Sequence, residues 1–291
     1  MNTISPIQQS TPASGKRPVL IFLRQLYAKP ASAVGATIFL AFVFLALFGP
    51  FLAPYGENEQ VYADARQPPS AEHWFGTDNL GRDVFSRTLL GARDILVLAG
   101  MGTLLAVVAG TFFGLLSGYR GGWFDELFMR FFDSLLAMPA LLLALLLLGL
   151  LGPNENSVML VLVIVYTPIV ARVVRSVVLS TKSKGYVEAA QIQGESQSHI
   201  LFREILPAVT PALTVEAALR FSYAIFLVAS LGFLGIGVQP PSANWGLMVS
   251  EGRAYVEQLP WALFFPAAAI ALLVIGVNLM ADGLRRVWER R

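Results

Sequence analysis

Several uninterrupted apolar runs, each about as long as a lipid bilayer is thick, constrain this sequence more than any other feature. A helix needs about 20 apolar residues to cross roughly 30 Å of hydrocarbon, and the run at 33–53 contains no charged residue. Hydrophobic residues make up 55% of the 291 residues and charged residues only 14%, which is far from the balance of a soluble domain. The sequence therefore predicts an all-α, polytopic membrane protein.

The apolar runs predict about six transmembrane helices. They cover residues 33–53, 95–117, 134–151, 158–174, 211–238 and 261–280. Only Gly152, Pro153 and a short polar turn separate the third run from the fourth, so we expect these two spans to form a hairpin. In the second run, Gly110, Gly114 and Gly118 recur every four positions. This spacing allows a neighbouring helix to approach closely.

The basic residues predict how the chain is oriented. Most of the 21 Lys and Arg residues flank the spans on the side that holds the N-terminus. Because Lys and Arg concentrate in cytoplasmic loops, both termini are predicted to be cytoplasmic. Residues 1–32 are then a cytoplasmic tail with an interfacial helix at 19–27. The run from Ala33 is too long for the core of a signal peptide and is expected to be retained as the first span.

The orientation leaves residues 54–94 and 239–260 outside. Within the first of these, the pattern predicts an amphipathic helix lying along the membrane surface. Its apolar face consists of Val84, Phe85, Thr88, Leu89 and Ala92, and its polar face of Arg82, Ser86, Arg87 and Arg93. The remaining residues, 95–291, form the membrane core with one long cytoplasmic loop, at 182–207.

Composition excludes several kinds of site. The chain has no cysteine, which rules out disulfides and thiol chemistry. His73 and His199 are predicted on opposite sides of the membrane and cannot share a metal ion. The net charge of +2 is too small to indicate a nucleic-acid partner. Residues Gly15, Lys16 and Arg17 lack the upstream glycine and the Ser or Thr of a phosphate-binding loop, so this chain is expected to bind no cofactor.

The cytoplasmic loop predicts two short helices. They are separated at Gly194, which can adopt a left-handed conformation, and Ser196 is placed to cap the second helix. Pro207 is expected to stop that helix before the fifth span. An apolar edge is formed by Ile200, Leu201 and Ile205. Periodicity leaves open whether this edge packs on the chain's own bundle or contacts another protein.

Three elements of this loop resemble the E-A-A…G…L-P signature of the permease subunits of ABC importers. In that family the loop docks on a cytoplasmic ATPase, and its glycine permits the tight turn. Glu204 departs from the general pattern, which has isoleucine there, although this shift is common in the peptide-importing branch. The resemblance implies an ATPase-coupling loop made by Tyr186, Glu188, Ala189, Ala190, Gly194, Leu206 and Pro207.

Four further stretches, in the right order, resemble the branch of this family that imports dipeptides, oligopeptides and nickel, and specifically the shorter of its two paired subunits. They are 76–87 with 91–93, 118–130 leading to Pro139, 233–241 with 244–246, and the C-terminal 278–285. At the C-terminus, Ala281 and Arg286 depart from the commonest residues. The resemblance runs from about residue 30 to the end and implies the type I ABC importer permease architecture.

The resemblance also implies partners and a compartment. The partners are a homologous second permease subunit, two ATP-binding cassette ATPases that bind ATP and Mg²⁺, and a periplasmic or lipid-anchored substrate-binding protein. The compartment is the bacterial inner membrane, where the chain also contacts lipid. Peptides are the cargo class that the resemblance favours, with nickel, opines and glutathione carried by relatives of the same branch.

Two groups of residues are candidates for contact with cargo or partner. Glu216 and Arg220 lie four residues apart within a span, where charge is costly and usually marks a pathway or a partner. The structural alternative is a self-neutralised pair facing the bundle interior. Candidates for the periplasmic mouth or for contact with the binding protein are Thr77, Asp78, Arg82, Gln239 and Trp245. For Thr77 and Asp78 the alternative is a role as helix caps and turn formers.

Two other functional classes compete with the ABC importer. A secondary, ion-coupled transporter would use charged residues near the membrane midplane, and such residues are sparse here. A membrane enzyme would show a cluster of catalytic groups near one surface, and the sequence contains no such cluster. An ATP-driven permease that does no bond chemistry itself is therefore the favoured interpretation.

Overall fold

The computed structural model describes residue 27 and residues 29–289, except for the side chains of residues 288 and 289. In this part of the chain, all the regular elements are helices. Five helical runs are long and apolar enough to cross a membrane. They are α2 Pro30–Leu52, α3 Val84–Arg120, α6 Glu155–Thr181, the run Gln197–Phe233, and α11 Pro260–Glu289. A sixth crossing forms if α4 Gly122–Leu136 and α5 Ala140–Leu151 count as one bent span. The predicted all-α architecture with about six spans is confirmed, whereas residues 19–26 of the predicted interfacial helix lie outside the described residues.

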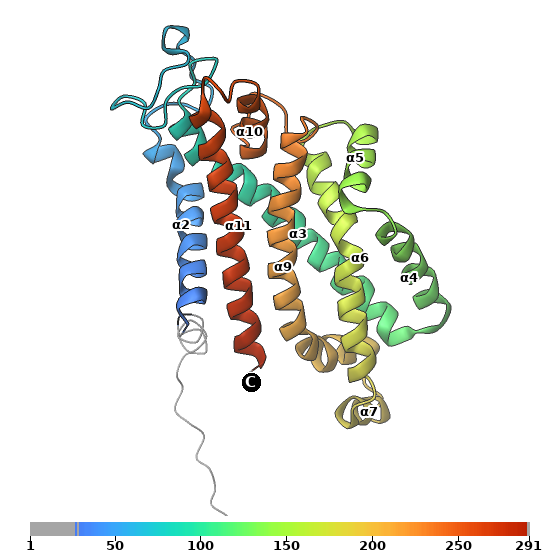
Figure 1. The fold of residues 1–291 in the computed structure, drawn as a ribbon. Coiled ribbons are helices and arrows are strands. Elements are labelled where there is room, and N and C mark those ends of the chain that lie inside the picture. Colours follow the sequence, from blue (N-terminus) through green and yellow to red (C-terminus); the bar gives the residue numbers. More distant parts are fainter. Residues whose placement is uncertain (1–26, 28, 290–291) are drawn as a thin grey trace, which may run out of the picture.

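The long helices lie side by side in one bundle (Figure 1). Helices α2 and α11 form one edge, α4, α5 and α6 form the other, and α3 crosses the bundle obliquely. One end carries the cap, by which we mean residues 53–83, with the short helix η1 Tyr62–Asp64, and residues 234–259, with α10 Trp245–Arg253. The opposite end carries α7 Gly185–Ile192, the start of α2 and the end of α11.

A row of glycines lets α3 and α6 pack with their backbones close together. A Cβ atom added at Gly110 would lie 2.6 Å from the Cβ atom of Val170, and one added at Gly114 would lie 2.6 Å from that of Val174. Farther along, a Cβ atom at Gly118 would lie 2.8 Å from that of the next valine in the row. The close approach predicted from the four-residue spacing of the glycines is confirmed.

The predicted third span at 134–151 is wrong as a continuous helix. Helix α4 ends at Leu136, α5 begins at Ala140, and the two meet at an angle of 94°. Pro139 lies at the break. Proline lacks the N–H of a helical residue and disfavours helical geometry in the residue before it, so the chain turns there. The predicted hairpin between the third and fourth spans does form, because only residues 152–154 separate α5 from α6.

The predicted surface helix is also wrong, because its residues are the first turns of α3. Asp83 caps this helix by accepting a hydrogen bond from the backbone N–H of Ser86 at 2.7 Å. The helix then continues without a break to Arg120. Arg87, predicted on the polar outer face, is only 1% exposed. Arg82, Ser86 and Arg87 of the predicted polar face are buried instead of facing water, and only Arg93 is exposed.

Pro207 does not stop a helix as predicted. The segments α8 Gln197–His199, η2 Ile200–Ile205 and α9 Leu206–Phe233 form one helical run. Within it, the η2 segment is a wider π-helical turn, in which the N–H of Leu206 donates to the carbonyl of Leu201, five residues earlier. A proline clashes with the carbonyl four residues before it in a regular helix, and the wider turn relieves this conflict. The fifth span consequently starts earlier than predicted and ends at Phe233.

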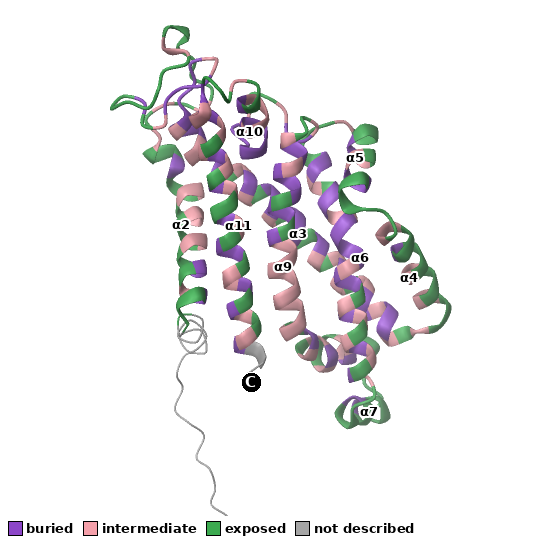
Figure 2. Ribbon diagram, viewed as in Figure 1, coloured by how far each residue is buried: buried purple, intermediate pink, exposed green. Residues whose placement is uncertain are grey.

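The outward faces of the bundle are apolar. Figure 2 shows exposed residues along α2 and α11. Those on α2 include Leu40, Phe44, Leu47 and Phe51. Large apolar side chains exposed along the length of a helix are typical of surfaces that face lipid or another membrane helix.

Candidate functional site

The loop at 182–207, which we call the coupling loop, is a helix-turn-helix as predicted. Helix α7 ends at Ile192, and Gly194 adopts a left-handed φ of 77°. The N–H of Glu195 donates to the carbonyl of Ala190, five residues earlier, at 3.1 Å, which closes the end of α7. Ser196 then caps the next helix by accepting from the N–H of His199 at 3.2 Å.

The coupling loop presents one apolar set to the bundle and another to the surroundings. Val187, Ile200 and Ile205 are at most 2% exposed and belong to one apolar cluster with residues of α3, α6 and α9. The edge predicted at 200–205 therefore packs on the chain's own bundle, as the first of the two alternatives had it. By contrast, Ile192 is 87% exposed and Phe202 is 60% exposed. Figure 1 shows α7 projecting beyond the ends of the long helices.

The remaining residues of the predicted coupling site divide in the same way. Tyr186, Glu188, Ala189 and Pro207 are exposed, whereas Ala190 is buried and Leu206 is half-buried. A Cβ atom added at Gly194 would meet no atom within 4 Å. Glycine is therefore needed there for its backbone conformation and not for space.

Glu216 and Arg220 form the predicted pair on α9. The Oε1 atom of Glu216 lies 2.7 Å from the Nε atom of Arg220. The guanidinium also lies over the ring of Tyr223, at 4.8 Å from its centroid, and 5.9 Å from that of Tyr166 on α6. Residues 211–221 of α9 are all half-buried. The pair therefore faces neither a packed core nor a fully open surface.

At the other end of the bundle, Arg87 joins two segments of the cap. Its guanidinium donates to the backbone carbonyls of Glu57 at 2.7 Å, Ser242 at 3.0 Å and Pro241 at 3.4 Å. The carboxylate of Glu57 accepts in turn from the N–H of Ala243 at 2.5 Å. These bonds hold residues 241–243 against Glu57, in the first segment of the cap, and against the start of α3.

Arg82 joins the first segment of the cap to α10 in the second segment. Its guanidinium lies between the carboxylates of Asp78 and of Glu251, the latter at 2.7 Å. Burial by itself lowers the pKa of Arg82, but the two carboxylates raise it above its usual value. The arginine therefore stays charged. Asp78 also accepts from the N–H of Leu80 at 2.8 Å, in the geometry of a turn former.

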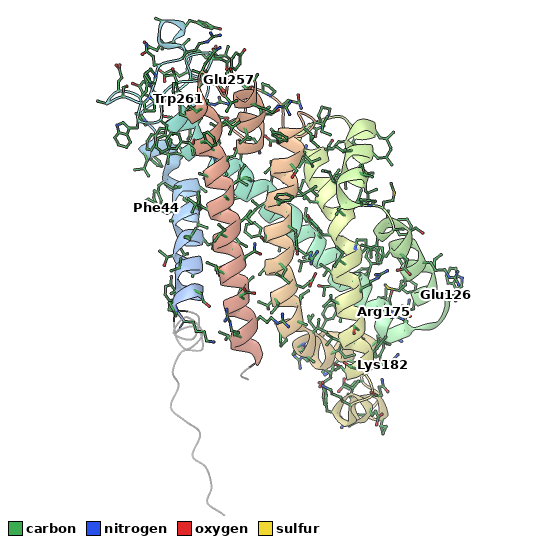
Figure 3. All side chains as sticks on the ribbon, viewed as in Figure 1. Phe44, Glu126, Arg175, Lys182, Glu257 and Trp261 are labelled. Carbon is green, nitrogen blue, oxygen red and sulfur yellow. The ribbon has the colours of Figure 1, made fainter. Side chains whose placement is uncertain are left out.

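Two tryptophans complete the cap. The indole N–H of Trp245 donates to the carbonyl of Thr88, and that of Trp261 donates to the carbonyl of Thr77, both at 2.9 Å. Figure 3 shows Trp261 among the side chains of the cap. Trp245 and Thr77 are fully buried, each with an exposed fraction of 0%.

Most of the residues that were predicted to contact a periplasmic binding protein therefore lie inside the cap. Thr77, Asp78, Arg82 and Trp245 are buried, so their side chains offer no surface to a binding protein. The alternative interpretation of Thr77 and Asp78 as structural residues fits this geometry. Gln239 is only half-buried, and its amide donates to the carbonyl of Gly237 at 3.1 Å.

The family described as "Binding-protein-dependent transport system inner membrane component" matches residues 110–291, which is more than half of the chain. The chain belongs to this family. The N-terminal part of this permease, at residues 18–69, matches the "N-terminal TM domain of oligopeptide transport permease C".

Curated relatives cover nearly the whole permease. The dipeptide transport system permease protein DppC of Alkalihalophilus pseudofirmus is 39% identical over 98% of this chain and 92% of the relative. The oligopeptide transport system permease protein OppC of Bacillus subtilis is 39% identical over 87% and 83%, respectively. The glutathione transport system permease protein GsiD of Pectobacterium atrosepticum is 40% identical over 91% and 87%.

Membership of this family settles the functional class. The protein is the permease subunit of an ABC importer, as the resemblance of the coupling loop to the family signature predicted. It is a transport protein of a membrane-spanning family, and the secondary-transporter alternative is set aside.

The structure of this permease also contains ion pairs that the sequence did not predict. Arg175 on α6 binds the carboxylate of Asp125 on α4 through two nitrogens, at 2.6 and 2.5 Å, and Arg172 pairs with Asp133. Figure 3 shows Arg175 on the side of α6 that faces α4. The signal was present in the sequence as acidic residues on one helix and arginines on the next. It could not be used without knowing that α4 bends back toward α6.

Proposed function

We propose that this permease imports peptides or similar small solutes in partnership with separate ATPase subunits. The relatives named for dipeptide, oligopeptide and glutathione transport support peptides as the cargo class. ATP and Mg²⁺ bind to the ATPase subunits, since the permease sequence contains no phosphate-binding loop. A homologous second permease subunit supplies the other half of the pathway, and a binding protein delivers cargo from the periplasm.

The exposed tip of the coupling loop carries this proposal. Ile192 is 87% exposed at the end of a helix that projects from the bundle. A large apolar side chain held there on a fixed turn is suited to a pocket on another protein. The loop is also joined to α9 by an uninterrupted helical run, Gln197–Phe233. Movement of an ATPase at the loop would therefore be transmitted directly to a membrane span, which is the requirement for alternating access.

The proposal fixes the orientation. The end that carries the coupling loop is cytoplasmic, because ATP is available there, and the cap is periplasmic. Both termini lie on the cytoplasmic side, in agreement with the distribution of Lys and Arg. The membrane is the bacterial inner membrane.

Copurification with the ATPase tests the docking role. We expect Ile192→Asp, which replaces the exposed apolar side chain by a carboxylate, to abolish copurification. Gly194→Trp should do the same by straining the left-handed turn. Val61→Asp is the matched control, because Val61 is an exposed apolar residue of the cap, 43% exposed, at the opposite end of the bundle. Retention of the ATPase by both loop variants would contradict the proposal.

We further propose that Glu216 and Arg220 line the translocation route and contact a charged terminus of the cargo. The pair is a costly feature within a span, and the half-buried length of α9 around it is consistent with an adjoining pathway. Uptake is measured at fixed protein level for Glu216→Gln, Arg220→Met and the double variant. A purely structural pair predicts that the double variant, which removes both charges, regains wild-type uptake.

Contact with cargo predicts instead that the double variant remains as defective as the single ones, with a raised KM. Unchanged transport kinetics in both single variants would refute the pathway assignment. A ligand screen on the copurifying binding protein would then identify the cargo itself.

A further inference from the structure

A polar hollow lies where α3 and α6 end beside the coupling loop. Its volume is about 530 Å³, and its lining includes Arg120, Lys182, Glu188, Tyr119 and Ser183. Among the described residues, neither Arg120 nor Lys182 has a carboxylate partner. Lys182 donates one hydrogen bond, to the carbonyl of Gly118 at 3.1 Å, so its other donors remain available. Figure 3 shows Lys182 at the end of α6, toward α7.

An apolar groove adjoins this hollow. Its volume is about 590 Å³, and Gln197 lines both spaces. One wall is a face of α3 running from Val107 to Leu116, and the other wall includes Leu201 and Phe202 of the coupling loop. At 1.5 Å per residue, the α3 wall is about 14 Å long. The groove therefore runs away from a charged site at the end of the bundle and into the length of the membrane spans.

This junction has the two parts that an amphiphile requires. The polar part contains two cationic side chains, whose charge complements a phosphate, and one carboxylate, whose charge complements an ammonium group. The apolar part is long enough for about two and a half turns of helix to contact an acyl chain. Basic pockets between membrane helices on the cytoplasmic side are suited to lipid headgroups.

We propose that this junction binds a phospholipid with a phosphoethanolamine headgroup. Arg120 and Lys182 bind the phosphate, Glu188 accepts hydrogen bonds from the ammonium group, and one acyl chain lies in the groove beside Val108 and Phe202. Both of the last two side chains are exposed, at 60% in each case, so a chain in the groove would cover apolar surface that this subunit leaves open. The lipid would join the end of α3 to the coupling loop.

The test is a lipid titration followed by native mass spectrometry. The full-length chain is purified in mild detergent with any copurifying subunits, stripped of lipid, and titrated with phosphatidylethanolamine. We expect the double variant Arg120→Gln, Lys182→Gln to bind this lipid about twenty-five-fold more weakly, since each basic residue near a membrane surface contributes about fivefold. Lys184→Gln is the control, because Lys184 is an exposed basic residue of the same loop that does not line the hollow.

Two further arms test the headgroup and the groove. Phosphatidylcholine, whose ammonium carries methyl groups and no N–H, should bind more weakly than phosphatidylethanolamine, and Glu188→Gln should abolish this difference. Val108→Trp should fill the groove and weaken binding of both lipids. Equal binding of phosphatidylethanolamine by the wild type and the double variant would overturn the proposal. Loss of the second permease subunit from Val108→Trp, with lipid binding unchanged, would overturn it as well, because the groove would then hold a protein helix.

Discussion

Arg87→Met is the substitution for which the structure makes the sharpest prediction. The guanidinium is 1% exposed and donates to three backbone carbonyls, two of them within 3.0 Å. A hydrogen bond from a charged donor contributes about 1.5–3 kcal/mol, so the two shorter bonds together contribute at least about 3 kcal/mol. Methionine avoids the cost of burying a charge, which places the expected loss at about 3 kcal/mol, the lower end of the range.

The loss should be local, because all three acceptors lie in the cap. We expect residues 241–243 to detach from Glu57 and the start of α3 while the membrane helices remain packed. A change of about 3 kcal/mol corresponds to roughly a hundredfold faster local opening. Hydrogen exchange measured by mass spectrometry should show this increase at the amides of Ser242, Ala243 and Asn244. Arg87→Lys, which keeps the charge but not the fork of donors, should give about a tenfold increase.

Arg93→Met provides the control. Arg93 lies on the same helix, six positions along, and is exposed. If Arg87→Met and Arg93→Met exchange at the same rate in residues 242–244, the reasoning is refuted and the guanidinium does not hold the cap together.

Three other predictions concern helix packing, an ion pair and the orientation of the chain in the membrane. Gly114→Val should lower stability by about 3 kcal/mol, because its Cβ would lie 2.6 Å from the carbonyl oxygen of Ala171. The control Gly149→Val should leave the Tm in detergent unchanged, because no atom lies within 4 Å of the added Cβ. Equal Tm values for the two variants would contradict close packing of α3 on α6. Arg175→Gln should make residues 121–139 sensitive to limited proteolysis, with partial rescue by Asp125→Asn, whereas Arg130→Gln should have no effect because the Arg130–Glu126 pair is exposed. Because the chain has no cysteine, single introduced cysteines report its orientation. A membrane-impermeant maleimide should label Tyr62→Cys in cells with a permeabilised outer membrane but should label Gln193→Cys only after lysis. The opposite labelling pattern would reverse the assigned topology.

Much of the fold followed from local patterns in the sequence. The spans, the hairpin at residues 152–154 and the helix-turn-helix of the coupling loop depend on apolar length and on turn residues such as Gly194. Each of these features is decided within one continuous stretch of chain, so a pattern is sufficient to predict it. The same holds for the glycines of α3, whose spacing alone indicates close helix packing.

The sequence-based predictions are wrong where the partners of a side chain lie far away in the sequence. The local pattern predicts that Arg87 faces water. In the structure its partners are carbonyls at residues 57 and 241–242, which no local pattern connects to Arg87. The bend at Pro139 does not follow from the sequence pattern, for a different reason. Proline can be accommodated within a span when neighbours permit it, as the wider turn before Pro207 shows, so composition does not decide between a kink and a break.

The class of the protein follows from its sequence: apolar length requires membrane helices, and the resemblance of Glu188, Gly194 and Pro207 to the loop signature of the family indicates an ABC permease. The packing of the folded chain determines which polar residues are available to partners and which hold the protein together. Arg82, Thr77 and Trp245 looked like contact residues but are buried in the cap, whereas Ile192 is exposed at the tip of the coupling loop. Burial depends on what the rest of the chain places beside a residue, and that is settled by long-range packing.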